Sequence, residues 1–144
     1  MFKTVKAAAL IASALLMSTG VNASSEHPLT PDFVDGTTRV SAEEVVALVE
    51  KTPNLVIIDA RKASDFKKGF IEGAVSMPNT DTTPAALAKV VKSKATPILF
   101  YCNGVRCGRS VDSSKVALAA GYKNVYWFRG GIEEWENKGL PLVH

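Results

Sequence analysis

The chain has 144 residues, with 17 basic and 14 acidic side chains and a formal net charge of +3. That length suits a single domain with a hydrophobic core. No dense basic run with interleaved aromatic residues is present, which disfavours a nucleic-acid partner. The two cysteines allow at most one intramolecular disulfide, and no Cys/His cluster has zinc-ligand spacing. We therefore expect neither a disulfide-stabilised scaffold nor a metal or cofactor.

The first residues contain the three parts of a secretory signal peptide. Lys3 and Lys6 precede an apolar run over residues 7–17, and small residues follow up to Ala23. The alternative is an uncleaved anchor or an amphipathic helix, but the run is shorter than the roughly 20 residues that span a bilayer. We expect a signal peptide over residues 1–23 and a mature form that is periplasmic or secreted, without a membrane partner. Loss of Lys3 and Lys6 lowers the net charge from +3 to +1.

The start of the mature chain divides into a polar segment and the first helix of a domain. Residues 24–37 hold two prolines and a glycine and are expected to be extended. The domain is expected over residues 38–144. Its first helix has a clear start, because Ser41 can cap it and Glu44 completes a capping box.

Short apolar runs alternate with helical segments over the rest of the chain. Continuous apolar runs are typical of strands covered on both faces of a sheet. The alternation predicts an α/β domain with a mainly parallel central sheet flanked by helices. Strands are expected at residues 55–59, 74–77, 97–101 and 125–128. Later helices are expected around residues 63–69, after Thr83 with Pro84 in the first turn, from Ser110 to Ala120 before Gly121, and near Ile132.

Chemically useful residues follow three of the expected strands. Ligands of such sheets bind beyond the carboxyl ends of the strands. Asp59, Cys102 and Arg129 with Gly130 occupy those positions. Ordinary loop polarity accounts for Asp59 or Arg129 alone, and a free cysteine is most often an inert buried thiol. The residues that follow Cys102 argue against that inert role.

The segment after Cys102 has the composition of an anion-binding loop. A thiol reacts as its thiolate, which positive charge and aligned backbone N–H groups stabilise. Gly104 and Gly108 are expected to allow turns with positive φ, so that successive N–H groups converge. The next helix adds the positive end of its dipole. The candidate loop consists of Asn103, Gly104, Val105, Arg106, Cys107, Gly108 and Arg109.

Three stretches resemble the signatures of one family. They are IDAR with DFKKGFIEGAVSMP (residues 58–61 and 65–78), YCNGVRCGRS (101–110) and GYKNVYWFRGGIEEW (121–135). With these stretches the chain resembles a single-domain rhodanese, a thiosulfate sulfurtransferase-type protein, over roughly residues 40–142. The resemblance implies a rhodanese-like three-layer fold with a mainly parallel central sheet.

The resemblance also implies a reaction. Cys102 would attack the sulfane sulfur of thiosulfate or a similar donor, sulfite would leave, and the Cys102 persulfide would pass its sulfur to a thiol or cyanide. The loop would hold the persulfide and the donor, and Asp59 and Arg61 match the acid–arginine pair that braces it. The implied partners are a small anionic sulfur donor, a thiol acceptor, and a periplasmic redox or sulfur-carrier protein.

The sequence departs from the family pattern at two places. Phe70 stands where histidine is usual, away from the nucleophile. The loop between Cys102 and Arg109 is two residues longer than in many members. Related phosphatases and arsenate reductases also have longer loops, but their C-x5-R pattern would place arginine where Gly108 stands. An oxyanion-processing enzyme of that kind stays open as an alternative, as does a thiol redox or sulfur-carrier module.

The second cysteine lies inside the enlarged loop. Cys107 is either a small apolar filler, a resolving cysteine that forms a reversible disulfide with Cys102, or an acceptor of the Cys102 sulfur. The disulfide requires Cα atoms within about 7 Å of each other, a condition that a curled loop can meet.

Overall fold

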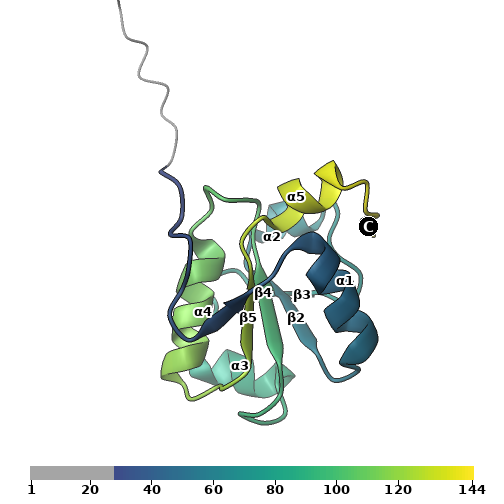
Figure 1. Ribbon diagram of the computed structural model, residues 1–144. Coiled ribbons are helices and arrows are strands. Elements are labelled where there is room, and N and C mark those ends of the chain that lie inside the picture. Colours follow the sequence, from purple (N-terminus) through teal and green to yellow (C-terminus); the bar gives the residue numbers. More distant parts are fainter. Residues whose placement is uncertain (1–27) are drawn as a thin grey trace, which may run out of the picture.

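The computed structural model describes residues 28–144, so the predicted signal peptide lies outside the described residues. A five-stranded sheet with the order β1-β5-β4-β2-β3 forms the centre of the molecule (Figure 1). All neighbouring strands pair in parallel, which confirms the predicted fold class. The strands are β1 (Thr37–Arg39), β2 (Val56–Asp59), β3 (Val75–Ser76), β4 (Ile98–Tyr101) and β5 (Val125–Phe128).

Helices cover both faces of the sheet and produce three layers. On β4, Leu99 and Tyr101 join a core cluster with residues of α1 and α5, whereas Ile98 and Phe100 join a second cluster with residues of α3 and α4. This alternation follows from the opposite directions of successive side chains in a strand. The helices are α1 (Ala42–Lys51), α2 (Ala63–Phe66), α3 (Pro84–Val90), α4 (Arg109–Ala119) and α5 (Gly131–Asn137).

The helix-start signals in the sequence are confirmed. The Ser41 hydroxyl accepts a hydrogen bond from the Glu44 N–H, and the Glu44 carboxylate accepts one of 2.7 Å from the Ser41 N–H. Thr83 caps α3, with Pro84 as the first helical residue. Gly121 follows α4 with φ of +92°, as expected of a glycine that ends a helix.

The sequence analysis missed the edge strand β1. Its three residues, Thr37–Arg39, are polar and only partly covered, so they carry no hydrophobic pattern. They pair with β5, and the Val40 N–H continues the ladder to the Trp127 carbonyl at 3.0 Å. The sheet therefore begins inside the segment that the sequence suggested would be a simple extended lead-in.

A buried ionic network joins the carboxyl ends of β2 and β4. The Asp59 carboxylate accepts hydrogen bonds from Arg61 Nη2 and from the Tyr101 hydroxyl, both at 2.7 Å. Arg61 Nη2 also donates to the Gly69 carbonyl, and the Tyr101 hydroxyl accepts from the Ile71 N–H. Burial, and then the Asp59 charge, raise the pKa of Tyr101, so the phenol keeps its proton and donates a hydrogen bond to Asp59. Asp59 and Arg61 thus hold Cys102's strand against the segment before β3.

We predict that Asp59→Asn destabilises the fold by about 3–5 kcal/mol, because it leaves the Arg61 cation buried without its counter-charge. Asp65→Asn is the matched control, since Asp65 pairs at 3.4 Å with a well-exposed Lys68 and should cost about 1 kcal/mol or less. Urea denaturation of both variants measures the difference. Equal losses of stability would contradict the bracing role of Asp59.

Candidate active site

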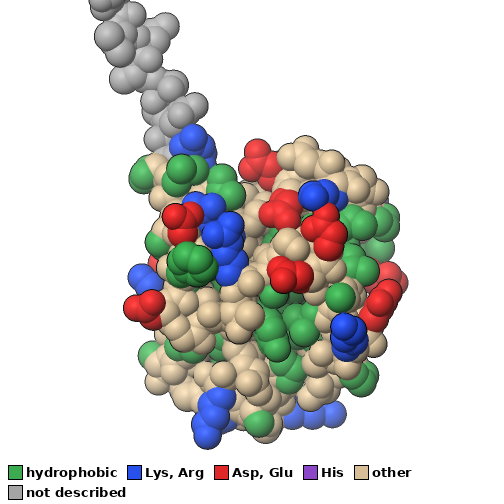
Figure 2. Space-filling model, in the orientation of Figure 1, with side chains coloured by type: hydrophobic (Ala, Val, Ile, Leu, Met, Phe, Trp, Pro, Cys, Tyr) green, Lys and Arg blue, Asp and Glu red, His purple; other side chains and the backbone are tan. Residues whose placement is uncertain are grey.

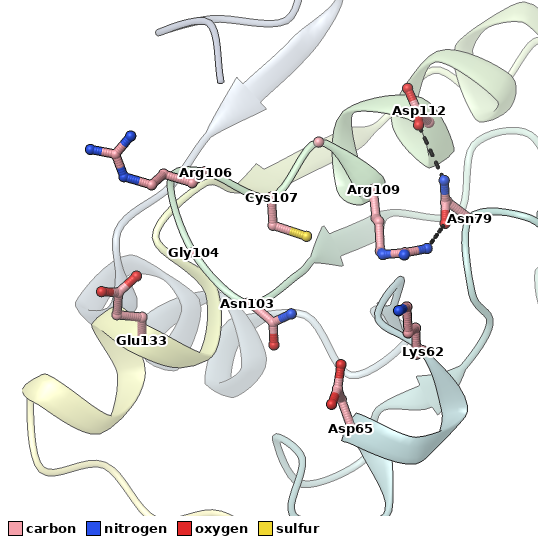
Figure 3. Close-up of a pocket in the computed structure, with 11 residues that line it drawn as sticks. Lys62, Asp65, Asn79, Asn103, Gly104, Arg106, Cys107, Arg109, Asp112 and Glu133 are labelled. Carbon is pink, nitrogen blue, oxygen red and sulfur yellow. Dashed lines mark hydrogen bonds between the residues drawn. The ribbon is translucent and has the colours of Figure 1, made fainter. Parts of the chain in front are cut away.

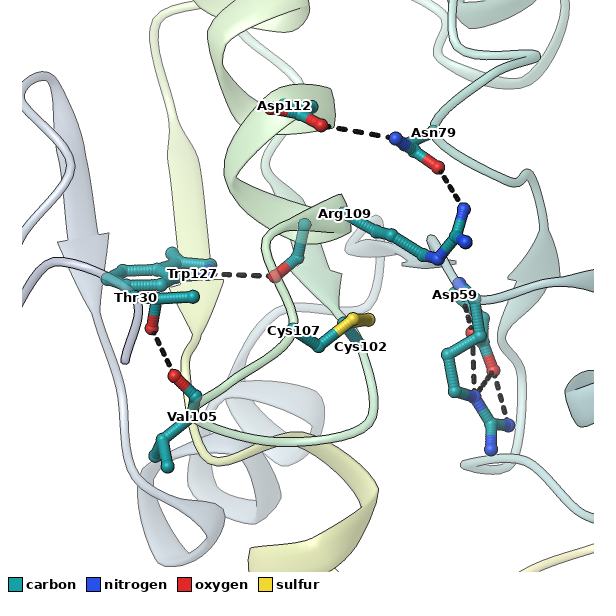
Figure 4. Close-up of a disulfide and its surroundings, with 11 residues drawn as sticks. Thr30, Asp59, Asn79, Cys102, Val105, Cys107, Arg109, Asp112 and Trp127 are labelled. Carbon is teal, nitrogen blue, oxygen red and sulfur yellow. Dashed lines mark hydrogen bonds and ion pairs between the residues drawn. A yellow bond between two sulfur atoms is a disulfide. The ribbon is translucent and has the colours of Figure 1, made fainter. Parts of the chain in front are cut away.

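The two cysteines form a disulfide at the carboxyl end of β4 (Figure 4). Cys102 follows the last residue of β4 and is only 1% exposed. Cys107 comes back over it from the loop, with the two Cα atoms 6.1 Å apart. The loop therefore curls tightly enough to meet the distance condition for a disulfide, and the candidate nucleophile Cys102 lies next to the second cysteine.

The loop reaches this shape without the positive φ angles expected of its glycines. Neither Gly104 nor Gly108 is among the described glycines with a positive φ, so that prediction is wrong. Gly108 has φ of −78° and is the N-cap of α4, and the Cys107 N–H donates to the Gly104 carbonyl at 2.9 Å. A Cβ on Gly104 would meet the Glu133 side chain, whose exposed carboxylate end can move aside.

The start of α5 holds the first two loop residues by their backbone. The Ile132 N–H donates to the Cys102 carbonyl at 3.0 Å, and the Glu133 N–H donates to the Asn103 carbonyl at 2.8 Å. Gly131 makes this approach possible with φ of +55°, where an added Cβ would collide with the Cys102 carbonyl oxygen. The Gly130–Gly131 pair was visible in the sequence, but its contact with Cys102 was not.

Trp127 of β5 fixes the first turn of α4 beside the disulfide. Its indole N–H donates to the Ser110 hydroxyl at 3.0 Å, and both side chains are buried. The N-cap Gly108 has no side chain that could satisfy the first N–H groups of α4. These N–H groups and the helix dipole supply positive potential at this end of the helix.

A cavity of about 600 Å³ opens over the loop (Figure 3). Cys107 lines this cavity. Four other residues predicted for the site do not line it: Asp59, Arg61, Cys102 and Val105. The other predicted loop residues that line it are Asn103, Gly104, Arg106, Gly108 and Arg109.

Five further residues of the cavity wall were missed from the sequence. Asn79 is the most informative, because its side chain accepts from Arg109 Nη1 at 2.7 Å and donates to the Asp112 carboxylate at 3.1 Å. It follows Pro78 just after β3, so the rule of strand carboxyl ends could have found it. The five residues are Lys62, Asp65, Asn79, Asp112 and Glu133.

The cavity wall carries both signs of charge, whereas the sequence analysis identified only the basic residues of the loop. Three of its residues are cationic and three carry carboxylates, namely Lys62, Arg106 and Arg109, and Asp65, Asp112 and Glu133. Figure 3 shows the Arg109 side chain directed toward Asn79 and Lys62, with Arg106 on the other side of the loop. Acidic and basic side chains also lie interspersed on the face seen in Figure 2.

Arg129 lies outside the cavity wall and holds the N-terminal segment instead. Its guanidinium donates to the backbone carbonyls of Thr30 and Pro31 at 2.8 and 3.0 Å. Thr30 in turn donates twice to the Val105 carbonyl, from its N–H at 2.8 Å and from its hydroxyl at 2.7 Å (Figure 4). The segment before β1 is thus a brace on the outer part of the enlarged loop.

The model of the rhodanese-like domain matches residues 41–138, which include every residue of the cavity wall. The chain belongs to the rhodanese-like domain family. Among its relatives are tRNA uridine(34) hydroxylases of Yersinia pestis (strain Pestoides F) and of Pectobacterium carotovorum, each 31% identical over 111 residues. These residues are 72% of this chain but only 30% of each relative.

Solved structures agree with this membership in the rhodanese-like family. A thiosulfate sulfurtransferase from Pseudomonas aeruginosa superposes with a TM-score of 0.64 at 29% identity, over 75% of this chain and 20% of that one. A protein from Bacillus halodurans superposes with a TM-score of 0.67 over 74% of this chain and 77% of that one, at 21% identity, and shows the fold alone. The comparisons therefore show the rhodanese-like family and its fold, and they do not select a substrate.

Two further features are absent from residues 28–144. No helix in that range is long and apolar enough to cross a membrane. The same range contains no group of three or more His, Cys, Asp or Glu side chains placed to hold a metal ion.

We predict that Gly131→Ala impairs the site as well as the fold. Any side chain at a positive φ costs about 1–3 kcal/mol, and here Cβ also meets the Cys102 carbonyl. Gly139→Ala is the matched control, with φ of +70° and open space around the added Cβ. Urea denaturation should show a larger loss of stability for Gly131→Ala, and only that variant should alter the rate at which dithiothreitol reduces the Cys102–Cys107 disulfide. The same behaviour in both variants would contradict the contact.

Proposed function

We propose that the protein is an exported sulfurtransferase that carries sulfane sulfur as a Cys102 persulfide. The observation that supports it most is the position of Cys102. A buried cysteine follows a central strand at the N-terminal end of α4, in a chain of the rhodanese-like family. The name of the Pseudomonas neighbour favours thiosulfate as the donor class. From the named hydroxylases we take only the shared domain, because it is 30% of their length.

The first half-reaction is a nucleophilic displacement at sulfur. The reduced Cys102 thiolate attacks the outer sulfur of thiosulfate, the S–S bond of the donor breaks, and sulfite leaves with the electron pair. The α4 N-terminus stabilises the thiolate before attack and the persulfide anion after it. In the second half-reaction a thiol or cyanide attacks the outer sulfur and Cys102 leaves as the thiolate.

The disulfide sets a condition on this chemistry. Cys102 cannot attack a donor while it is bonded to Cys107, so the disulfide form must be reduced before turnover. Disulfides persist in oxidising compartments such as the periplasm, which agrees with the proposed export. A periplasmic thiol acceptor or redox protein is the partner class that this condition requires.

The cavity bears on the alternative of an oxyanion-processing enzyme. Loop residues 103, 104 and 106–109 line it, but Gly108 is the helix N-cap and offers no guanidinium to a bound phosphate. The nearest arginine side chain in sequence, Arg109, is held by Asn79. Sulfur transfer therefore has the stronger support.

Mass spectrometry of the reduced, desalted protein after mixing with thiosulfate tests the proposal. We expect release of sulfite and, in samples quenched with acid at early times, one added sulfur atom on Cys102, which cyanide added before the quench removes. Cys102→Ser should abolish both sulfite release and the adduct, whereas Cys107→Ser should retain both. Absence of the adduct together with hydrolysis of phosphate esters would contradict sulfur transfer and favour the oxyanion-processing alternative.

A further inference from the structure

The two sulfur atoms of the disulfide differ in their access to solvent. Cys102 is buried to 1% exposure behind the loop, whereas Cys107 is half-buried and lines the cavity. Figure 3 shows the Cys107 sulfur on the cavity side of the loop. A thiol that enters the cavity therefore meets the Cys107 sulfur before it meets Cys102.

The contacts that place Cys107 do not depend on the disulfide. Its N–H donates to the Gly104 carbonyl, which closes a tight turn, and Thr30 binds the Val105 carbonyl inside that turn. The Cys102 side is fixed separately, by the Ile132 N–H on its carbonyl. Reduction of the bond thus leaves two thiols that the backbone holds within reach of each other.

We propose that Cys107 is a resolving cysteine, so that the protein reduces sulfane sulfur to sulfide and then accepts electrons from a dithiol reductant. This inference rests on the proposed Cys102 persulfide. The Cys107 thiolate attacks the Cys102 sulfur, the bond between that sulfur and the outer sulfur breaks, and hydrosulfide leaves with the electron pair. The product is the Cys102–Cys107 disulfide that the structure contains. Two cysteine sulfurs are oxidised by two electrons in total, and the sulfane sulfur is reduced to sulfide.

The reductant restores the two thiols in two exchanges. One thiolate of the dithiol attacks the exposed Cys107 sulfur, and Cys102 leaves as a thiolate toward the α4 N-terminus, which favours it as the leaving group. The second thiol of the reductant then breaks the mixed disulfide and releases Cys107. The cavity volume of about 600 Å³ lies within the roughly 300–1,000 Å³ of ligand pockets, which leaves room for a cysteine-bearing segment of the reductant.

Sulfide release in a single turnover tests the resolving step. Reduced, desalted protein is mixed with thiosulfate, and sulfite and sulfide are measured without added thiol. The wild type should release both, in equal amounts, and end as the disulfide. Cys107→Ser should still release sulfite, should release less than about a tenth of the wild-type sulfide, and should keep its persulfide until dithiothreitol is added.

The two readouts separate failure of this inference from failure of the proposed function. Absence of sulfite in the wild type would overturn the Cys102 persulfide itself. Sulfite without sulfide in the wild type, or persulfide found on Cys107, would overturn only the resolving role. Undiminished sulfide from Cys107→Ser would do the same.

A trapping experiment identifies the sulfur that the reductant attacks. The disulfide form is treated with glutathione, quenched with acid and digested with trypsin. Cleavage after Lys94, Arg106 and Arg109 places the two cysteines on separate peptides, residues 95–106 and 107–109. We expect glutathione on Cys107 in at least about tenfold excess over Cys102. Preferential modification of Cys102 would overturn the proposed direction of attack.

Discussion

The hydrogen bond from the Ile132 N–H to the Cys102 carbonyl, at 3.0 Å, is the contact on which the geometry of the site depends. It joins the end of a central strand to the first turn of α5, and it exists because Gly131 lets the two backbones approach. This contact fixes the start of the loop at Cys102. Residues 103–108 must then leave Cys102 in one direction and turn to reach the first residue of α4. The position of Cys107 over Cys102 is a consequence of that short path.

The contacts around the loop come from every layer of the fold. The Asp59 network holds the strand ends beneath it, Trp127 holds the first turn of α4, and Thr30 holds Val105 from outside. Such a braced loop keeps its shape when the disulfide opens, and this is what a reversible cysteine pair requires. A disulfide whose only role was to stabilise the chain would need no such support.

Much of the fold could be predicted from the sequence because its signals are local. The capping box at Ser41 and the apolar run of β4 each determine one element without help from distant residues. Strand β1 could not be predicted, since its polar residues are ordered only by pairing with β5. The nucleophile was visible as a thiol after an apolar strand. The role of Arg129 could not be predicted because its partner, Thr30, lies 99 residues away in the chain. The charged residues opposite the loop were missed because they come from three other segments, at α2, α4 and α5.

The timing of a single turnover tests the central claim most directly, namely that Cys102 takes the sulfur and Cys107 displaces it. Reduced wild-type protein is mixed with thiosulfate, quenched at intervals, and followed by mass spectrometry of the Cys102 persulfide and the Cys102–Cys107 disulfide. The account predicts that the persulfide forms first and decays at the rate at which the disulfide appears, with a rate independent of added thiol and of protein concentration. A decay whose rate rises in proportion to added thiol, or a disulfide that appears before any persulfide, would contradict it.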